Sequence, residues 1–378
     1  MDLGLSEIQQ MLKTSAQDFL SRECPLTLVR EMEEDPRGFT DDLWRQMVGL
    51  GWTGVAFPEQ YGGTGGNFGD LGVLLEEIGR SLAPSPFFST VVLGGMTVLD
   101  AGTDVQKDEL ISRICAGSII MTMAIPEASA TYEPWGIEAT ASQQGNSYEI
   151  SGTKLFVPDA ESADVIIVAA RTSTDQDPAN GISLFLVPSG TNGLNISPMQ
   201  SIGNERVFEV SLDKVHVSAD AVLGPVGEGW AIIERSVMRA TAAQCIEMLG
   251  GAEAVLEMTV EYAKGRTQFG RAIGSFQAVQ HHCARMATDV EGSKNIAYQA
   301  VWRLSEGLPA QKEVAMAKAW IGPAYRRVCG TAHQCHGAIG FTKEHDLQLY
   351  TRRAKVHELT YGDANYHKDV AFRHLDDE

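Results

Sequence analysis

The stretch SYEISGTKLFVPDAESADVIIVAA spans residues 147–170 and contains three short β-prone runs separated by turn residues. Further runs rich in β-branched and aromatic residues follow at 182–187 and 207–217. Short strands at this spacing are typical of a small antiparallel barrel or sandwich. The sequence therefore predicts a middle β domain over residues 118–223.

Helical periodicity flanks this block on both sides. Before it, apolar residues recur at helical spacing within residues 1–117. After it, four segments are long enough for a helical bundle, namely 230–262, 275–306, 311–338 and 345–374. We therefore predict an α+β protein of three domains: an N-terminal helical domain over 1–117, the middle β domain, and a C-terminal four-helix bundle over 224–378.

The composition of the chain limits its partners. A formal net charge of −19 disfavours nucleic acid, because phosphates attract a basic surface. The apolar runs are far too short to cross a bilayer, and the N-terminus lacks the pattern of a signal peptide. Six cysteines without CxxC spacing predict free thiols in a reducing compartment. We therefore expect a cytoplasmic protein that binds neither nucleic acid nor membrane.

A chain this acidic needs local basic groups to bind a phosphate-rich ligand. Residues 264–271 read KGRTQFGR and carry three basic side chains within eight positions. A guanidinium can bind a pyrophosphate through two hydrogen bonds, and the ring of Phe269 can stack on an adenine. An ordinary solvated turn, closed by Gly270, explains the same residues equally well.

A second candidate anion site is the segment 334–341, QCHGAIGF. Two glycines after a long helix let backbone N–H groups approach an anion closely, and Gln334 adds a side-chain donor. A plain helix end and turn is the alternative interpretation. His333 and His336 are three residues apart, but no third ligand accompanies them, so we expect no metal site.

Together these motifs resemble the acyl-CoA dehydrogenase family. The resemblance rests on Arg266–Gly270, Phe276–Gln277 and residues 334–340, and it extends over nearly the whole chain. It implies an FAD cofactor and a homo- or heterotetramer built from two dimers. It also implies which residues contact FAD, partly across a subunit boundary: Arg266, Gln268, Phe269, Gln277, Gln334, Gly337, Ala338 and Phe156. Ala338 departs from the family's usual glycine, and Phe156 stands where an aromatic residue usually covers the flavin.

The resemblance further implies the α,β-dehydrogenation of an acyl-CoA thioester to a 2-enoyl-CoA. A base removes the proton from Cα, and the hydride leaves Cβ for the flavin. The family's usual base is a glutamate directly before a glycine, but this chain has Tyr361 there. A tyrosine is a poor base at neutral pH, although its backbone N–H can still donate to the thioester carbonyl. The family's alternative position for the base is Ala240 here.

Two carboxylates remain as candidate bases. Glu247 lies seven residues after Ala240, on the same face of an ideal helix and about 10 Å further along. Its neighbours are apolar, and the competing interpretations are a buried ion pair and a simply exposed side chain. The later glutamates of this helix are expected to form a solvated stripe, namely Glu253, Glu257 and Glu261. Asp363 lies two residues past Tyr361, where it can act as a base or cap the next helix.

Other family features are incomplete in this sequence. The family's Thr-Glu-Pro segment and its following Gly-Ser-Asp are reduced to AIPEAS at 124–129, and Pro158 replaces a threonine near the flavin. These losses resemble subunits of heteromeric dehydrogenases that act on bulky acyl chains in lipid or steroid catabolism.

Three interpretations stay open. The first is a competent dehydrogenase that uses Glu247 or Asp363. The second is a partner subunit that contributes FAD-binding groups while another chain supplies the base. The third is a flavin oxidase or structural flavoprotein with the same fold. The family implies electron-transfer flavoprotein as the electron acceptor.

Overall fold

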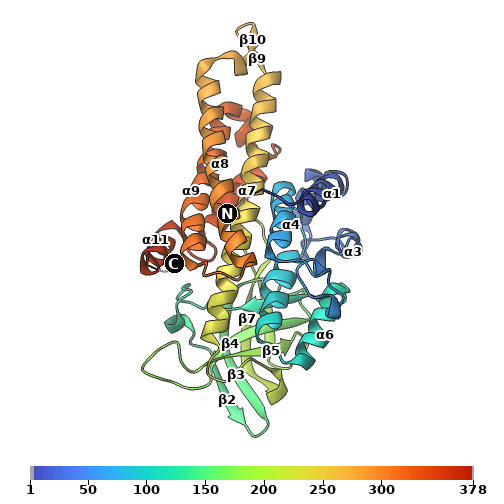
Figure 1. Ribbon diagram of the computed structural model, residues 1–378, viewed down its shortest axis with the longest axis vertical. Helices are drawn as coiled ribbons and strands as arrows, with labels where there is room; N and C mark the ends of the chain where they lie inside the picture. Colours follow the sequence, from blue (N-terminus) through green and yellow to red (C-terminus); the bar gives the residue numbers. More distant parts are fainter. Residues whose placement is uncertain (1–3, 377–378) are drawn as a thin grey trace. The chain divides into compact units, whose positions relative to one another are not determined.

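The computed structural model describes residues 4–376 and has the predicted order of helices, sheet and helices (Figure 1). The N-terminal helices are α1 (Glu7–Glu23), α2 (Leu26–Glu34), α3 (Asp41–Gly49), α4 (Phe68–Ser81), α5 (Met96–Ala101) and α6 (Asp104–Cys115). A π-helical segment, η3 (Phe88–Gly95), leads directly into α5.

Side-chain caps determine where several of these helices begin. At α4, Asn67 Oδ1 accepts the backbone N–H groups of Gly69 and Asp70, and the Asp70 carboxylate accepts the N–H of Asn67. Helices α1 and α6 begin with the same reciprocal arrangement at Ser6 and Thr103. Each of these capping boxes satisfies donors that a helix start otherwise leaves without partners.

The middle of the chain forms one eight-stranded sheet in the order β6-β7-β3-β2-β4-β5-β8, with β1 paired to β4. The strands are β1 (Met121–Ala124), β2 (Thr140–Gln144), β3 (Ser147–Pro158), β4 (Val165–Arg171), β5 (Ile182–Pro188), β6 (Leu194–Met199), β7 (Val207–Ser218) and β8 (Val222–Leu223). The predicted runs at 147–151 and 154–157 are one strand, β3, which two register shifts interrupt.

The prediction of a purely antiparallel sheet is wrong in one respect. Most neighbours are antiparallel, but β4 runs parallel to both β1 and β2. The long chain segment between β1 and β4 allows the second strand to return in the same direction as the first. The sheet is therefore mixed, although it is the small β domain that the sequence predicts.

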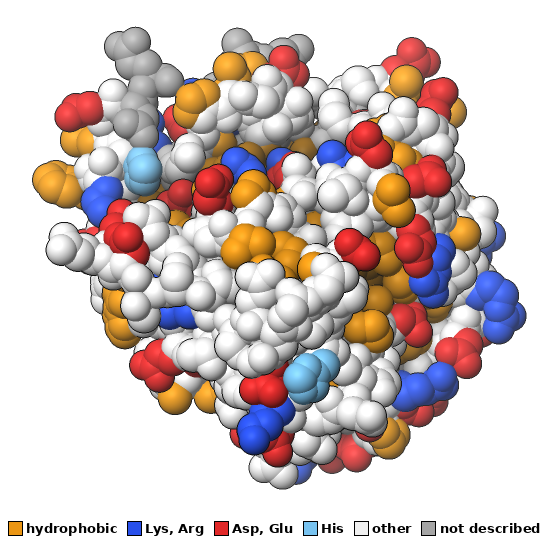
Figure 2. Space-filling view, turned by 90° about the horizontal axis from the view of Figure 1, so that it is seen from below, with side chains coloured by type: hydrophobic (Ala, Val, Ile, Leu, Met, Phe, Trp, Pro, Cys, Tyr) orange, Lys and Arg blue, Asp and Glu red, His pale blue; other side chains and the backbone are white. Residues whose placement is uncertain are grey.

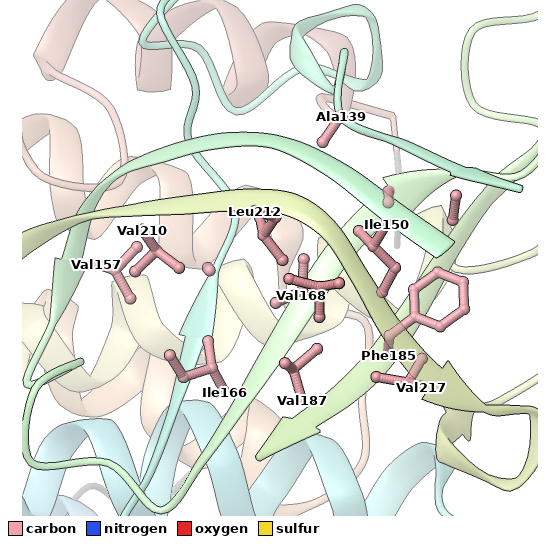
Figure 3. Packing of buried hydrophobic residues seen from close by; sticks show 14 of the residues in the cluster. Ala139, Ile150, Val157, Ile166, Val168, Phe185, Val187, Val210, Leu212 and Val217 are labelled. Carbon is pink, nitrogen blue, oxygen red and sulfur yellow. The ribbon is translucent and has the colours of Figure 1, made fainter. Parts of the chain in front are cut away.

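Alternate residues of the strands supply the core of this domain (Figure 3). Ile166 and Val168 of β4 lie opposite Val187 and Phe185 of β5, and all four side chains are buried in one cluster. Because side chains alternate across a strand, every second residue faces this cluster. Residues 166–170 are buried on both faces of the sheet, which explains why β4 reads as one continuous apolar run.

The C-terminal part is helical except for one small hairpin. Its elements are α7 (Trp230–Gly265), β9 (Thr267–Gln268), β10 (Arg271–Ala272), α8 (Gln277–Ser305), α9 (Gln311–His336), α10 (Leu347–Leu359) and α11 (Ala364–Arg373). The prediction of one helix over 345–374 is wrong. The chain breaks after α10 because Tyr361 and Gly362 have φ angles of 60° and 100°, and Asp363 then begins α11.

The chain folds into two compact units. The first comprises Met1–Glu31, Asn67–Ala83 and Thr241–Glu378, and the second comprises Met32–Gly66 and Pro84–Ala240. Each unit combines segments that are distant in sequence, so the domain boundaries near residues 117 and 223 stay a prediction.

Two glycines bring α4 and α7 into backbone contact within the first unit. A Cβ atom at Gly79 would lie 2.1 Å from the carbonyl oxygen of Glu247, and one at Gly250 would lie 1.9 Å from that of Glu76. No side chain fits at either distance, so both positions require glycine. The contact fixes the segment of α7 that carries Glu247.

The surface carries both signs of charge. Figure 2 shows one face, on which acidic and basic side chains are interspersed. All six cysteines are free thiols, as predicted. Within residues 4–376 no helix is long and apolar enough to cross a membrane, and no group of His, Cys, Asp and Glu side chains is placed to hold a metal ion.

Candidate functional site

The first predicted phosphate motif forms a hairpin at the end of α7 and α8 (Figure 1). Gln268 pairs with Arg271, and Phe269 and Gly270 make the two-residue loop. Both loop residues have positive φ, 53° and 78°, as in a type I′ turn. Glycine adopts this conformation freely, whereas a residue such as phenylalanine is strained in it by about 1–2 kcal/mol.

Phe269 is also almost fully solvated. Its side chain is 93% exposed, and its ring forms a T-shaped pair with that of Phe276 at a centroid distance of 6.1 Å. The guanidinium of Arg271 lies over the Phe276 ring at 4.1 Å from its centroid, a cation–π contact. The strained backbone therefore holds an aromatic ring in solvent, where it is available to a flat ligand.

Three further predicted residues present donors to solvent in the first unit. The side chains of Arg266, Gln277 and Gln334 are exposed, and none of them bonds to another of the described residues. The backbone of Arg266 is fixed on both sides, since its N–H donates to Tyr262 and its carbonyl accepts from Ile273, each at 2.8 Å. A fixed backbone with a free guanidinium suits the binding of an anion. Gln268 differs, because its amide donates to the Thr267 carbonyl at 2.7 Å.

Tyr262 joins the two predicted motifs, although nothing in the sequence singled it out. Its hydroxyl donates to the carbonyl of His336 at 3.4 Å, and the two rings stack with centroids 4.3 Å apart. Tyr262 lies one turn before Arg266, and His336 directly precedes Gly337. The structure therefore brings 264–271 and 334–341 together. An aromatic residue near a helix end gives no pattern that distinguishes this role from core packing.

The glycine loop after α9 leaves an open space. Gly337 ends the helix at φ 68° and ψ −147°, a region that essentially only glycine occupies. A Cβ atom there would meet nothing within 4 Å. Ala338 follows and is exposed, whereas Gly340 is packed against His336.

His336 is buried beside this loop and has no hydrogen-bond partner on either ring nitrogen among the described residues. Its ring meets His345 edge-on at 4.7 Å. Burial, followed by the charges of His345 and His333, lowers the pKa of His336 to about 4, so the ring is neutral at pH 7. Unsatisfied buried polar atoms are rare in folded proteins and indicate a missing partner.

In the second unit, Phe156 lies at the second register shift of β3. It is half-exposed with φ 56°, and its backbone N–H donates to Sδ of Met199 at 3.4 Å. The predicted aromatic residue is therefore available to a flat ligand.

A buried ion pair fixes the chain beside Phe156. Lys154 Nζ and Glu127 Oε1 lie 2.6 Å apart, and Glu127 also accepts the backbone N–H of Ala139 at 3.1 Å. Burial lowers the pKa of Lys154 to about 8, although Glu127 opposes this shift. The N–H of Leu155 donates to the Pro126 carbonyl at 2.8 Å. The backbone at 124–129 is thus held against β3 although the family's sequence is missing there.

The two candidates near the C-terminus have defined structural positions. Tyr361 is buried, and its carbonyl accepts from Nε2 of His367 at 2.8 Å. Asp363 Oδ1 accepts the backbone N–H groups of Asn365 and Tyr366 at 3.0 and 2.9 Å. Asp363 is therefore the N-cap of α11, which supports the capping interpretation.

Glu247 is partly buried on α7 among buried apolar neighbours, as predicted. The prediction of a solvated stripe on the same helix is wrong for its first member. The side chain of Glu253 is 17% exposed, compared with 59% for Glu257 and 70% for Glu261. Segments distant in sequence surround Glu253: Arg80 of α4 lies 3.6 Å from its carboxylate, and Lys13 of α1 and Lys294 of α8 act on it electrostatically. Periodicity within α7 alone does not reveal such segments.

Glu253 belongs to a buried group of carboxylates around Glu76. One oxygen of Glu76 pairs with Lys13 Nζ at 2.6 Å, and the other accepts from the hydroxyl of Tyr298. Burial, followed by the charge of Glu76, raises the pKa of Glu253 to about 7. Between pH 4.5 and about 7, Glu253 therefore keeps its proton in the native state, whereas the same side chain in an unfolded chain has lost it.

This pKa predicts a stability that depends on pH. Between pH 4.5 and 7 the native state holds one more proton at Glu253 than the unfolded state, so the free energy of unfolding falls as pH rises across this window. Glu253→Gln should reduce that fall by on the order of 2 kcal/mol. Urea denaturation at pH 5 and pH 7.5 measures it. Glu257→Gln, one turn away and exposed, is the matched control. Equal pH slopes for Glu253→Gln and wild type would contradict a raised pKa at Glu253.

Comparison with known proteins gives a consistent result over the whole chain. Models for the N-terminal, middle and C-terminal domains of acyl-CoA dehydrogenases match residues 6–118, 122–215 and 227–375. A probable acyl-CoA dehydrogenase, YngJ of Bacillus subtilis, is 30% identical over 99% of this chain and 100% of its own length. This chain belongs to the acyl-CoA dehydrogenase family.

Solved structures of acyl-CoA dehydrogenases and their relatives agree with this assignment. Butyryl-CoA dehydrogenase from Megasphaera elsdenii superposes with a TM-score of 0.92 at 27% identity, covering 99% of this chain and 100% of that one. The ChsE4–ChsE5 complex from Mycobacterium tuberculosis contains a chain with a TM-score of 0.91 at 28% identity, and both chains are covered completely. The predicted family and fold class are therefore confirmed.

The residues of this acyl-CoA dehydrogenase fit an FAD. The first unit presents a free guanidinium, two free amides, an exposed aromatic ring and an open glycine loop beside an unsatisfied histidine. The guanidinium suits the pyrophosphate of FAD, the amides suit ribose hydroxyls, and the aromatic ring suits the adenine. Arg266, Phe269, Gln277, Gln334 and Gly337 would hold the cofactor there.

Proposed function

We propose that this chain binds FAD and dehydrogenates an acyl-CoA thioester between Cα and Cβ to give a 2-enoyl-CoA. The observation that carries the proposal is the Arg266–Gly270 hairpin. It presents a guanidinium and a strained, solvated phenylalanine beside the Gly337 loop, in a chain of the acyl-CoA dehydrogenase family. FAD, when bound, supplies the hydride acceptor.

The protein has two tasks at the substrate. The backbone N–H of Tyr361 donates to the thioester carbonyl, which stabilises the charge that develops on that oxygen as Cα loses its proton. Glu247 is the proposed base for that proton. Its support is its partly buried carboxylate among apolar neighbours and the helix cap that already occupies Asp363. Electron-transfer flavoprotein is the proposed acceptor, because the family implies it.

A second candidate function is that of a partner subunit in a heteromeric enzyme. Tyr361 is buried where the family carries its glutamate, and a similar solved structure is a complex of two named proteins, ChsE4 and ChsE5. In such a tetramer this chain would contribute the FAD-binding hairpin while the other chain supplies the base.

Purification of this chain without a partner tests both functions. We expect a yellow protein whose flavin absorbance bleaches when an acyl-CoA is added anaerobically, across a panel from short chains to steroid side chains. A yellow protein that no acyl-CoA bleaches would favour the partner-subunit function. A protein that takes up no flavin, alone or with a co-expressed relative, would contradict the proposal.

A further inference from the structure

A buried lysine on α9 holds the end of α10. The Lys318 side chain is 1% exposed, and its Nζ donates to Gln244 Oε1 at 2.6 Å, to the Thr360 carbonyl at 2.7 Å and to the His357 carbonyl. An ammonium has three N–H donors, so these oxygens satisfy all of them. The two carbonyls terminate α10, where the helix dipole favours a cation.

The turn that follows is held in an uncommon conformation. Tyr361 has a φ of 60° and Gly362 a φ of 100°. His367 binds the Tyr361 carbonyl from one side, and the Asp363 cap fixes the start of α11 on the other. A non-glycine residue keeps a positive φ only where its surroundings enforce it. Lys318 adds a third constraint, because it binds the carbonyl of Thr360, the residue directly before Tyr361.

The Thr360 carbonyl and the Tyr361 N–H belong to one peptide unit. A trans peptide is planar, so its C=O and N–H point in opposite directions. Fixing the oxygen of Thr360 on Lys318 therefore fixes the direction of the Tyr361 N–H. Hydrogen bonds in a chain also polarise one another, so an ammonium on the oxygen strengthens the N–H as a donor.

We propose that Lys318 is a positioning residue whose ammonium orients and polarises the Tyr361 N–H toward the thioester carbonyl of an acyl-CoA. The proposal rests on the proposed function and deepens it. It assigns a part in carbonyl recognition to a lysine that acts through a peptide unit. All three hydrogen bonds of Lys318 go to neutral oxygens, and none goes to a carboxylate. The proposed role explains why the protein keeps a buried cation at this position.

A matched pair of ligands tests this role on the flavin-loaded protein. One is an acyl-CoA whose Cβ carries no hydrogen, which binds without reducing the flavin. The other is the S-alkyl-CoA thioether of the same carbon skeleton, which lacks the carbonyl oxygen. We expect wild type to bind the thioester about tenfold more tightly, equivalent to about 1.4 kcal/mol. Calorimetry measures both affinities.

Lys318→Met keeps an unbranched side chain and removes the charge. It should lose most of the thioester preference while its thioether affinity stays the same, whereas general damage would weaken both ligands alike. Lys355→Met, a half-exposed lysine paired with Glu358 on α10, is the matched control and should keep the preference. A Lys318→Met protein with the full preference overturns the inference and leaves the proposed function intact. Wild type that binds neither ligand would contradict the proposed function itself.

The wild-type protein offers a second test that needs no variant. Several titratable groups face Lys318: Cys245 of α7, His357 and Glu358 of α10, and Asp363 and His367 at α11. Burial lowers the pKa of Lys318 to about 8, raises that of Cys245 to about 12 and lowers that of His367 to about 4. The thioester preference should therefore fall as pH rises from 7 to 9.5. A preference that is constant over this range overturns the inference, even if Lys318→Met does not fold.

Discussion

Glu247→Gln should leave a folded, yellow protein that binds acyl-CoA but bleaches about 10²–10⁴-fold more slowly, because a positioned general base contributes about that factor. The amide keeps the size of the carboxylate and cannot accept the α-proton. Stopped-flow absorbance of the flavin under anaerobic conditions measures the rate. Glu257→Gln makes the same change on the exposed face of the same helix and should not alter it.

Two other outcomes separate the alternatives. If Glu247 is half of a buried ion pair, its loss leaves an uncompensated charge, and Glu247→Gln should lower the free energy of unfolding by about 3–5 kcal/mol. Asp363→Asn is informative because asparagine also caps helices well, so the variant keeps α11 and removes only the charge. A folded Glu247→Gln protein with a normal rate would exclude Glu247 and leave Asp363 or a partner's carboxylate as the base.

Arg266→Ala should lower flavin affinity and weaken the oligomer at the same time. Hydrogen bonds to a charged group contribute about 1.5–3 kcal/mol, so we expect flavin to bind about 10–100-fold more weakly. An FAD that contacts two subunits stabilises their association by linkage, so its loss should shift the protein toward smaller species. The ratio of flavin to protein absorbance and sedimentation velocity measure the two effects.

The same hairpin supplies the control for this experiment. Arg271 pairs with Gln268 across the hairpin, and its guanidinium lies over the Phe276 ring. It is not among the proposed cofactor ligands. Arg271→Ala therefore changes the charge of the hairpin equally and should affect flavin content much less. An Arg266→Ala protein with full flavin content would show that this guanidinium does not bind the pyrophosphate.

Features that depend on local pattern were predictable from the sequence. Strand β4 reads as a continuous apolar run because both of its faces are buried. Residues 264–271 include the turn between two helices that was one interpretation of their sequence. Features that depend on distant segments were not. The surroundings of Glu253 come from α1, α4 and α8. Lys318 on α9 resembles any other helical lysine until α10 ends against it. The break at Tyr361 was missed because helical periodicity continues on both sides of it.

The bare contact between α4 and α7 limits how the first unit can move. At Gly79 and Gly250 each backbone meets the other without a side chain between them, so neither helix can rotate or slide past its neighbour without a collision of main-chain atoms. The two helices should therefore behave as one rigid body on the microsecond-to-millisecond timescale of most collective motions. Any internal motion of this unit therefore has to use other hinges, and one such break in its helices is the turn between α10 and α11, with its positive φ angles.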